Sequence, residues 1–362
     1  MSNKSKKTKG KWTTKKKVLL VVIIAAIVVG ILAGGYAYAM HYINSKLNEI
    51  ERVDITEAED NFSEVEEVEP ETTYTTIAFF GIDNRSNGNF ESGNSDSIML
   101  VAINDVTKEV KISSVYRDTY LCVDDSEMKF RKANYAYNAG GPTQAITMLQ
   151  KNLDVQISDY VAVDFNALAE IVELMGGLEF DVTQAEANEM NKFIGETASQ
   201  TGNQSSSVYA GVQTLDGAQT VAYARIRKIA GNDYGRAERQ REVVEKMVAK
   251  MKESDYATLI KILDSIVDDI STSFTNDELK DYAMNIGGYK IGETTGFPFE
   301  KTTDTPNMTV GSIVIPVNLD NNVEELHKFL YPDDENEYTP SETVKNYSNT
   351  IVNNLGQYTA TE

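Results

Sequence analysis

Three short apolar runs decide the fold of this chain: TIAFFGI (residues 76–82), IMLVAIN (98–104) and VKISSV (110–115). Their length and their β-branched and aromatic residues are typical of strands. A polar loop of twelve residues, 84–95, lies between the first two runs, and the short turn DVTK lies between the last two. The sequence therefore predicts three strands that run back and forth beside one another.

Further along the chain, expected strands and helices alternate. The hydrophobic periodicity and the flanking glycine and proline signals predict strands over 160–164, 178–182 and 312–317. By the same reasoning, the expected helices span 142–153, 166–175, 235–252, 256–269 and 321–330. Such alternation indicates an α/β fold, which we expect to be a three-layer α/β/α sandwich with a mixed central sheet.

The amino terminus predicts a membrane anchor. Residues 1–17 hold eight lysines and no acid, and residues 18–40 carry no charge. A helix over 18–40 would be roughly 34 Å long, enough to cross a hydrocarbon layer of about 30 Å. The lysines should stay in the cytoplasm, which places the remainder outside the cell as a single-pass membrane protein. A cleaved signal peptide is the alternative, with Ala37-Tyr38-Ala39 as the cleavage site.

The charge pattern also suggests how the chain is divided. After the basic tail (1–17) and the transmembrane helix (18–40), residues 41–71 are rich in acids and are expected to form an extracellular stalk. The main domain is expected over residues 72–255. Residues 256–362 are expected to form a C-terminal helical extension with a late strand.

Composition excludes several classes of protein. The formal net charge of −21 and the pI of about 4.6 argue against nucleic-acid binding, which needs a basic surface. The single cysteine, Cys122, rules out an internal disulfide framework. His41 and His327 are the only histidines, which leaves little material for a Ser-His-Asp relay.

Charged residues flank the ends of the three predicted strands. Asp83 and Arg85 come after the first strand, Asp96 precedes the second, and Arg117 with Asp118 follows the third. If the strands pair antiparallel, all of these residues reach the same end of the sheet. The sequence therefore predicts a site there, although polar residues at strand ends are common.

A second cluster lies in YARIRKIAGNDYGRAERQR, residues 223–241, which is basic in an otherwise acidic domain. Arginine forks bind phosphate oxygens in bidentate fashion, and a helix N-terminus adds partial positive charge. Two carboxylates facing such a cluster also suggest a divalent cation, Mg²⁺ or Mn²⁺, bound together with substrate phosphates. We therefore expect a pyrophosphate or phosphodiester site formed with Arg225, Arg227, Arg236, Arg239 and Gln240. The alternative is a solvated helix face with ion pairs.

These residues also carry a resemblance. FFGIDNR, SDSIMLVAIN, ISSVYRDTY, KANYAYNAGG and the arginine-rich stretch resemble the ordered motifs of the LytR–CpsA–Psr family over about residues 76–252. The resemblance implies an α/β sandwich with a hydrophobic groove for a polyprenyl chain. It also implies a transferase that moves a glycopolymer (teichoic acid, capsular or other wall polysaccharide) from a polyprenyl-pyrophosphate carrier to peptidoglycan, with Mg²⁺ at the pyrophosphate.

Site roles are implied residue by residue. Asp83 and Asp96 match the acidic pair associated with the metal. The matched pyrophosphate-binding residues are Arg85, Arg117, Lys132, Asn134, Arg225, Arg227, Arg236, Arg239 and Gln240. The chain departs from the family pattern in two places, with VYRD in place of the frequent IPRD and Tyr135 in place of a common histidine.

The mechanism follows from what phosphoryl transfer requires, which is positioning and charge neutralisation more than a covalent nucleophile. Arg117 would neutralise charge, and Asp96 or Asp118 would serve as the base for the acceptor hydroxyl. The expected partners are the polyprenyl-pyrophosphate-linked glycopolymer, peptidoglycan and the cytoplasmic membrane. A pyrophosphohydrolase and a non-catalytic polymer-binding regulator are the alternatives. The apolar stripes at 145–149 and 168–175 could line the lipid groove or pack in an ordinary core.

The anchor prediction has a direct test. Protease added to intact protoplasts should remove everything beyond the membrane, because residues 41–362 are expected to face the wall. Immunoblotting against the C-terminal region measures the loss. Survival of that region until the membrane is lysed would contradict the predicted topology.

Overall fold

The computed structural model describes residues 38–63, 73–82, 90, 93–202, 204–229, 232–306, 310–332 and 338–356. Two compact units divide the chain, residues 1–48 and residues 49–362. In the first unit, residues 38–47 are helical. The predicted transmembrane segment 18–40 lies outside the described residues except for its last three. Among the residues that are described, no helix is both long and apolar enough to cross a bilayer.

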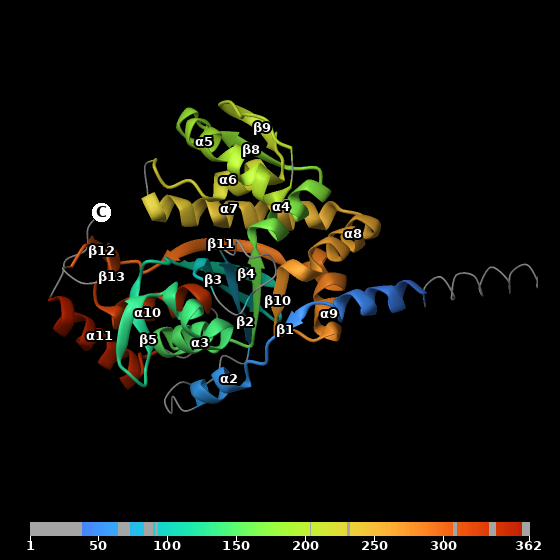
Figure 1. The fold of residues 1–362 in the computed structure, drawn as a ribbon. Coiled ribbons are helices and arrows are strands. Elements are labelled where there is room, and N and C mark those ends of the chain that lie inside the picture. Colours follow the sequence, from blue (N-terminus) through green and yellow to red (C-terminus); the bar gives the residue numbers. More distant parts are fainter. Residues whose placement is uncertain are drawn as a thin grey trace, which may run out of the picture. The chain divides into compact units, whose positions relative to one another are not determined.

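A mixed sheet of seven strands organises the second unit (Figure 1). Its order is β1 (Glu51–Arg52), β10 (Ile270–Thr272), β7 (Asp159–Asp164), β2 (Tyr74–Ile82), β3 (Ser95–Asn104), β4 (Glu109–Val115) and β11 (Lys290–Phe297). Strands β2, β3 and β4 pair antiparallel, as the apolar runs predict. Strands β7 and β11 run parallel to β2 and β4, so the predicted mixed sheet is confirmed.

One face of the sheet is fully buried. Ala78, Phe80 and Leu100 point to this face and are inaccessible to solvent. They pack in one core with α2 (Thr56–Ser63), α3 (Tyr135–Leu153), α10 (Leu319–Leu330) and α11 (Glu342–Leu355). The apolar stripe 145–149 packs in this core, and the stripe 168–175 packs in the second core described below. Both stripes are therefore part of the hydrophobic core.

The opposite face is covered less completely. Ile77, Met99 and Ile112 are buried there, but Phe79 and Val101 are only partly buried. The helices on this face are α7 (Asn232–Glu253) and α9 (Asn276–Asn285), followed by the short η2 (Ile286–Gly288). The sheet between two helical layers confirms the predicted three-layer sandwich.

A second core lies on the other side of α7, at the top of Figure 1. Its helices are α4 (Phe165–Leu174), α5 (Gln184–Thr201), α6 (Gly217–Ala224) and α8 (Tyr256–Ile266), with the short η1 (Val267–Asp269) after α8. The hairpin of β8 (Leu178–Val182) and β9 (Gly211–Leu215) packs with them. Two further hairpins complete the unit, β5 (Tyr120–Asp124) with β6 (Lys129–Lys132) and β12 (Lys301–Asp304) with β13 (Ile313–Pro316).

The structure differs from the predicted boundaries at two places. Residues 51–63 were expected in a solvated stalk, but β1 joins the sheet, Ile55 is buried just before α2, and α2 buries Ala58 and Phe62. Residues 256–362 supply β10 and β11 to the central sheet, so they do not form a separate extension. The acidic composition around α2 hid three apolar residues at helical spacing, and β11 (KIGETTGF) lacks an apolar run.

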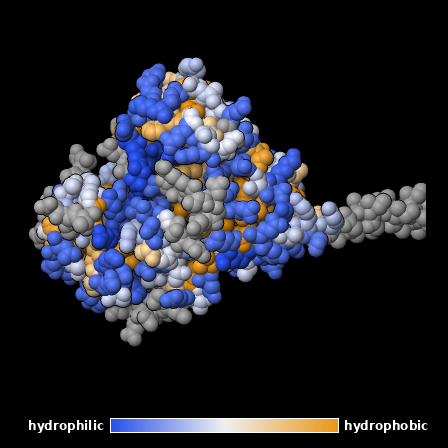
Figure 2. All heavy atoms as spheres, in the orientation of Figure 1, coloured by the Kyte–Doolittle hydropathy of each residue, from blue (hydrophilic) through white to orange (hydrophobic). Residues whose placement is uncertain are grey.

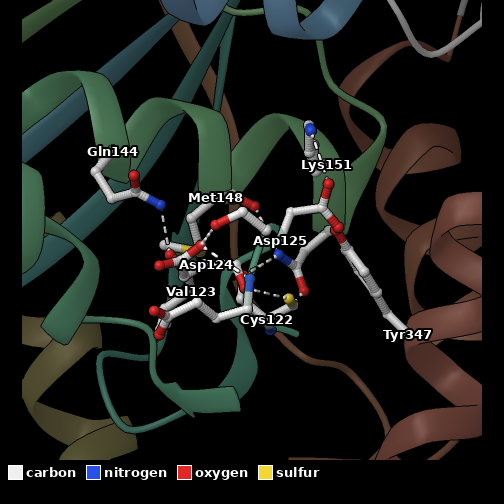
Figure 3. Close-up of polar contacts among 11 residues, drawn as sticks. Cys122, Val123, Asp124, Asp125, Gln144, Met148, Lys151 and Tyr347 are labelled. Carbon is white, nitrogen blue, oxygen red and sulfur yellow. Dashed lines mark hydrogen bonds and ion pairs between the residues drawn. The ribbon is translucent and has the colours of Figure 1, made fainter. Parts of the chain in front are cut away.

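Polar contacts fix β5 to α3 and α11 (Figure 3). Tyr347 donates from its hydroxyl to Asp125 Oδ1 at 2.6 Å, and Lys151 Nζ lies 3.0 Å from Asp125 Oδ2. The Gln144 amide donates to the Val123 carbonyl at 2.5 Å. Burial raises the pKa of the Cys122 thiol to about 11. Cys122 therefore stays a neutral thiol within this framework and is not an activated nucleophile.

A buried carboxylate makes the stability depend on pH. Asp164 caps α4 by accepting from the backbone amides of Asn166 and Ala167 at 2.8 and 2.9 Å. Desolvation by burial, with the negative charge of Asp269 nearby, raises the pKa of Asp164 to about 6. The folded state therefore binds more protons than the unfolded state between about pH 4 and pH 6, and this contribution weakens stability as pH rises through that window.

We predict that Asp164→Asn stabilises the protein at pH 7 by about 1–3 kcal/mol, because asparagine caps a helix equally well and carries no charge. The slope of stability between about pH 4 and pH 6 should also flatten. Denaturant unfolding of the full chain in detergent measures both. Asp255→Asn is the matched control, since Asp255 caps α8 at the surface. A lower stability of Asp164→Asn at pH 7 would contradict the account.

Candidate functional site

The register of the sheet brings the predicted residues to one end. Ile82 pairs with Ser95, and Met99 pairs with Ser114, so the start of β3 lies beside the end of β4. A Cβ at Gly81 would lie 2.9 Å from the Ser97 Cβ, so the chain needs glycine at this close approach. Asp96 on β3 therefore lies next to the loop that follows β4.

Backbone hydrogen bonds hold that loop from two sides. The Asn134 amide donates to the Arg117 carbonyl at 3.0 Å, and the Ala133 amide donates to the Thr119 carbonyl at 2.8 Å. On the other side, the Val314 amide of β13 donates to the Asp118 carbonyl at 2.9 Å. The backbone of residues 117–119 is thus held by two separate segments of the chain, residues 133–134 and β13.

A chain of ion pairs forms the centre of the site. Arg117 Nη1 lies 2.5 Å from Asp96 Oδ1, and Arg227 Nη2 lies 3.1 Å from Asp96 Oδ2. On the far side, Arg117 Nε lies 3.6 Å from Asp118 Oδ2, and Lys132 Nζ lies 2.8 Å from Asp118 Oδ1. Three cations face two carboxylates, so these five residues carry a net charge of +1 in a strongly acidic protein. We call them the Asp96 centre.

The remaining predicted residues divide into two groups. Asn134 is buried beside the Asp96 centre through its backbone contact with Arg117, and Arg236 is a buried residue of α7 with only 4% of its surface exposed. Gln240 is half-buried on the same helix. The predicted Asp83 and Arg85 lie outside the described residues.

Arg225 and Arg239 instead contact the second core. Arg225 Nη1 lies 3.5 Å from both Thr197 Oγ1 and Gln200 Oε1, and its guanidinium stacks 5.1 Å over the Phe165 ring. Arg239 donates to the Ile226 carbonyl at 2.7 Å. Glu186 lies 3.9 Å from Arg239, and its role was not visible in the sequence because 53 residues separate the two.

The surface around these elements is polar. Figure 2 shows hydrophilic side chains between the α5–α6 region and the β12–β13 end of the unit. Among the described residues, no three or more His, Cys, Asp or Glu side chains are arranged so that they could hold a metal ion together. Asp96 can still ligate a cation, because each carboxylate oxygen that accepts one hydrogen bond keeps a second lone pair.

The fold and the Asp96 centre together define an α/β protein with a cluster of ion pairs, rich in cationic side chains, at the end of a central sheet. The sequence model of the LytR_cpsA_psr family matches residues 37–322, so the chain belongs to this family.

Comparison with individual proteins agrees with this assignment. The polyisoprenyl-teichoic acid–peptidoglycan teichoic acid transferase TagU of Enterococcus faecalis is 29% identical over 230 residues, which cover 62% of this chain and 71% of TagU. A crystal structure of a Streptococcus agalactiae protein is 25% identical with a TM-score of 0.60, covering 75% of this chain and 92% of that one. TagT of B. subtilis, solved with a bound octaprenyl pyrophosphate lipid, shares the fold at 20% identity and a TM-score of 0.51, over 73% of this chain and 93% of TagT.

The ion pairs of the Asp96 centre should differ in their effect on stability. Arg227→Gln is expected to change the free energy of unfolding by less than about 1 kcal/mol, because the Arg227 side chain is 46% exposed. Asp96→Asn is expected to cost about 1–3 kcal/mol, because it weakens the pairing of the mostly buried Arg117. Urea unfolding measures both values. An equal loss of unfolding free energy in Arg227→Gln and Asp96→Asn would contradict this prediction and show that Arg227 stabilises the fold.

Proposed function

We propose that this protein is a membrane-anchored extracellular phosphotransferase that attaches a glycopolymer from a polyprenyl-pyrophosphate carrier to peptidoglycan. The observation that carries the proposal is the convergence of Arg117 and Arg227 on one carboxylate. Two guanidinium forks that meet at a single oxyanion provide the donors that a pyrophosphate needs. Family membership and the transferase relatives support the same activity.

The partly covered sheet face suits the lipid carrier. Phe79 and Val101 lie on this face beneath α7, and the Asp96 centre lies at the end of the same sheet. An apolar layer of this kind would hold a polyprenyl chain while the pyrophosphate reaches the arginines. The glycopolymer would then extend away from the sheet toward the polar surface.

The reaction is a displacement at phosphorus. A hydroxyl of peptidoglycan attacks the phosphate next to the glycan, the bond to the bridging oxygen breaks, and polyprenyl phosphate leaves. Arg117, Arg227 and Lys132 stabilise the negative charge that develops on the phosphates. Asp96 or Asp118 accepts the proton of the attacking hydroxyl, as both carboxylates lie in the Asp96 centre.

Mg²⁺, or Mn²⁺, is part of the proposal as the cofactor. Asp96 would hold it together with the predicted Asp83, and the bound ion would neutralise charge on the substrate phosphates. The anchor predicted for residues 18–40 would keep the site at the outer face of the cytoplasmic membrane, where the lipid carrier and the cell wall meet.

The proposal is tested with the full chain in detergent, a polyprenyl-pyrophosphate glycan, Mg²⁺ and uncrosslinked peptidoglycan. We predict covalent attachment of glycan, lost on chelation and reduced at least about ten-fold in Arg227→Lys, because lysine keeps the charge but lacks the fork. Arg131→Lys on β6 is the matched control and should transfer normally. Release of free glycan would indicate a hydrolase instead. Absence of turnover with intact lipid binding would indicate a binding protein.

A further inference from the structure

A further buried cation, Arg241, lies outside the Asp96 centre. Arg241 on α7 is 8% exposed, and its Nε and Nη1 atoms have no hydrogen-bond partner among the described residues. Burial lowers the pKa of Arg241, and Glu238 and Glu245 on the same helix act against this lowering through their negative charge. A buried guanidinium without hydrogen-bonded acceptors is costly, which points to an acceptor that is not part of the described protein.

The surroundings of Arg241 supply further donors. Tyr116 follows β4 and packs against Ala237, one turn before Arg241 on the same face of α7. The Tyr116 hydroxyl lies over Gly296 of β11, where any Cβ would collide with it. Gly296 pairs with Ser114, whose buried hydroxyl also has no hydrogen-bond partner among the described residues. Hydroxyl and guanidinium donors therefore meet between α7 and the β4–β11 edge.

A lysine and a second tyrosine close the outer side of this space. Lys301 Nζ of β12 lies 5.3 Å from the ring centre of Tyr116 and 5.1 Å from that of Tyr234. The two rings are 4.7 Å apart, and Tyr234 exchanges a hydrogen bond of 2.9 Å with Thr303. Tyr234 and Lys301 are only partly buried, so the outer side is the one that a ligand could enter.

We propose that Arg241, Ser114, Tyr116 and Lys301 form a second oxyanion subsite that binds one phosphate group. Two cations and two hydroxyls match the several oxygens of a phosphate better than the two oxygens of a carboxylate. The phosphate could belong to the polyprenyl phosphate or to a phosphodiester of the glycopolymer. The assignment of the phosphate to one of these two molecules rests on the proposed function. The prediction that the subsite binds a phosphate group does not.

The test measures thermal unfolding of the full chain in detergent. Without phosphate, Arg241→Met should unfold at the same or a higher temperature than wild type, because it replaces a buried charge that has two guanidinium nitrogens without acceptors among the described residues by an apolar chain of similar length. Inorganic phosphate should stabilise wild type and Arg227→Gln, and the phosphate concentration for half-maximal effect should rise at least about ten-fold in Arg241→Met. Lys250→Gln removes a charge from an exposed position of α7 and is the control.

The outcomes separate this subsite from the Asp96 centre. A lower unfolding temperature of phosphate-free Arg241→Met, or equal phosphate stabilisation in wild type and variant, would overturn the proposal. Tyr116→Phe keeps the ring and should weaken phosphate binding without loss of stability, which guards against a folding defect. Competition by glycerol 3-phosphate would identify a polymer phosphodiester, and competition by a short polyprenyl monophosphate would identify the carrier. If the wild-type protein does not transfer glycan but shows the expected phosphate stabilisation and its loss in Arg241→Met, the proposed function is wrong and the phosphate subsite stands.

Discussion

The site depends on one interaction, the Asp96 carboxylate held between Arg117 and Arg227. The two arginines come from segments 110 residues apart, and the carboxylate neutralises their mutual repulsion in the folded protein. An anionic substrate can take over the same role, because the guanidinium groups already point at one oxyanion. Binding then needs little reorganisation of the protein, which is the condition for efficient electrostatic stabilisation.

The sheet explains why these groups meet. Antiparallel pairing of β2, β3 and β4 places the start of β3 beside the end of β4. Residues 133–134, which follow β6, and β13 hold the loop after β4 by its backbone. The loop is therefore held by segments that contribute no side chain to the Asp96 centre except that of Lys132. The less covered sheet face beneath α7 lies next to this rigid end, so an apolar carrier and its charged head group can be bound by adjoining surfaces.

Much of this arrangement could be predicted from local patterns. Apolar runs identified the three central strands, and antiparallel pairing then placed Asp96, Arg117 and Asp118 together. Patterns could not identify α2, where the buried Ala58 and Phe62 lie in an acidic segment, or β11, whose glycines and threonines have no apolar period. The separation of Arg225 and Arg239 from the Asp96 centre also needed the structure, since it depends on contacts with α5 and with the backbone of residue 226.

The most direct test of the central claim is a crystal structure of the chain with a polyprenyl pyrophosphate bound. The account predicts phosphate oxygens within hydrogen-bonding distance of the Arg117 and Arg227 guanidiniums, with the hydrocarbon chain against Phe79 and Val101 beneath α7. A pyrophosphate bound elsewhere, with neither arginine in contact with it, would contradict the account.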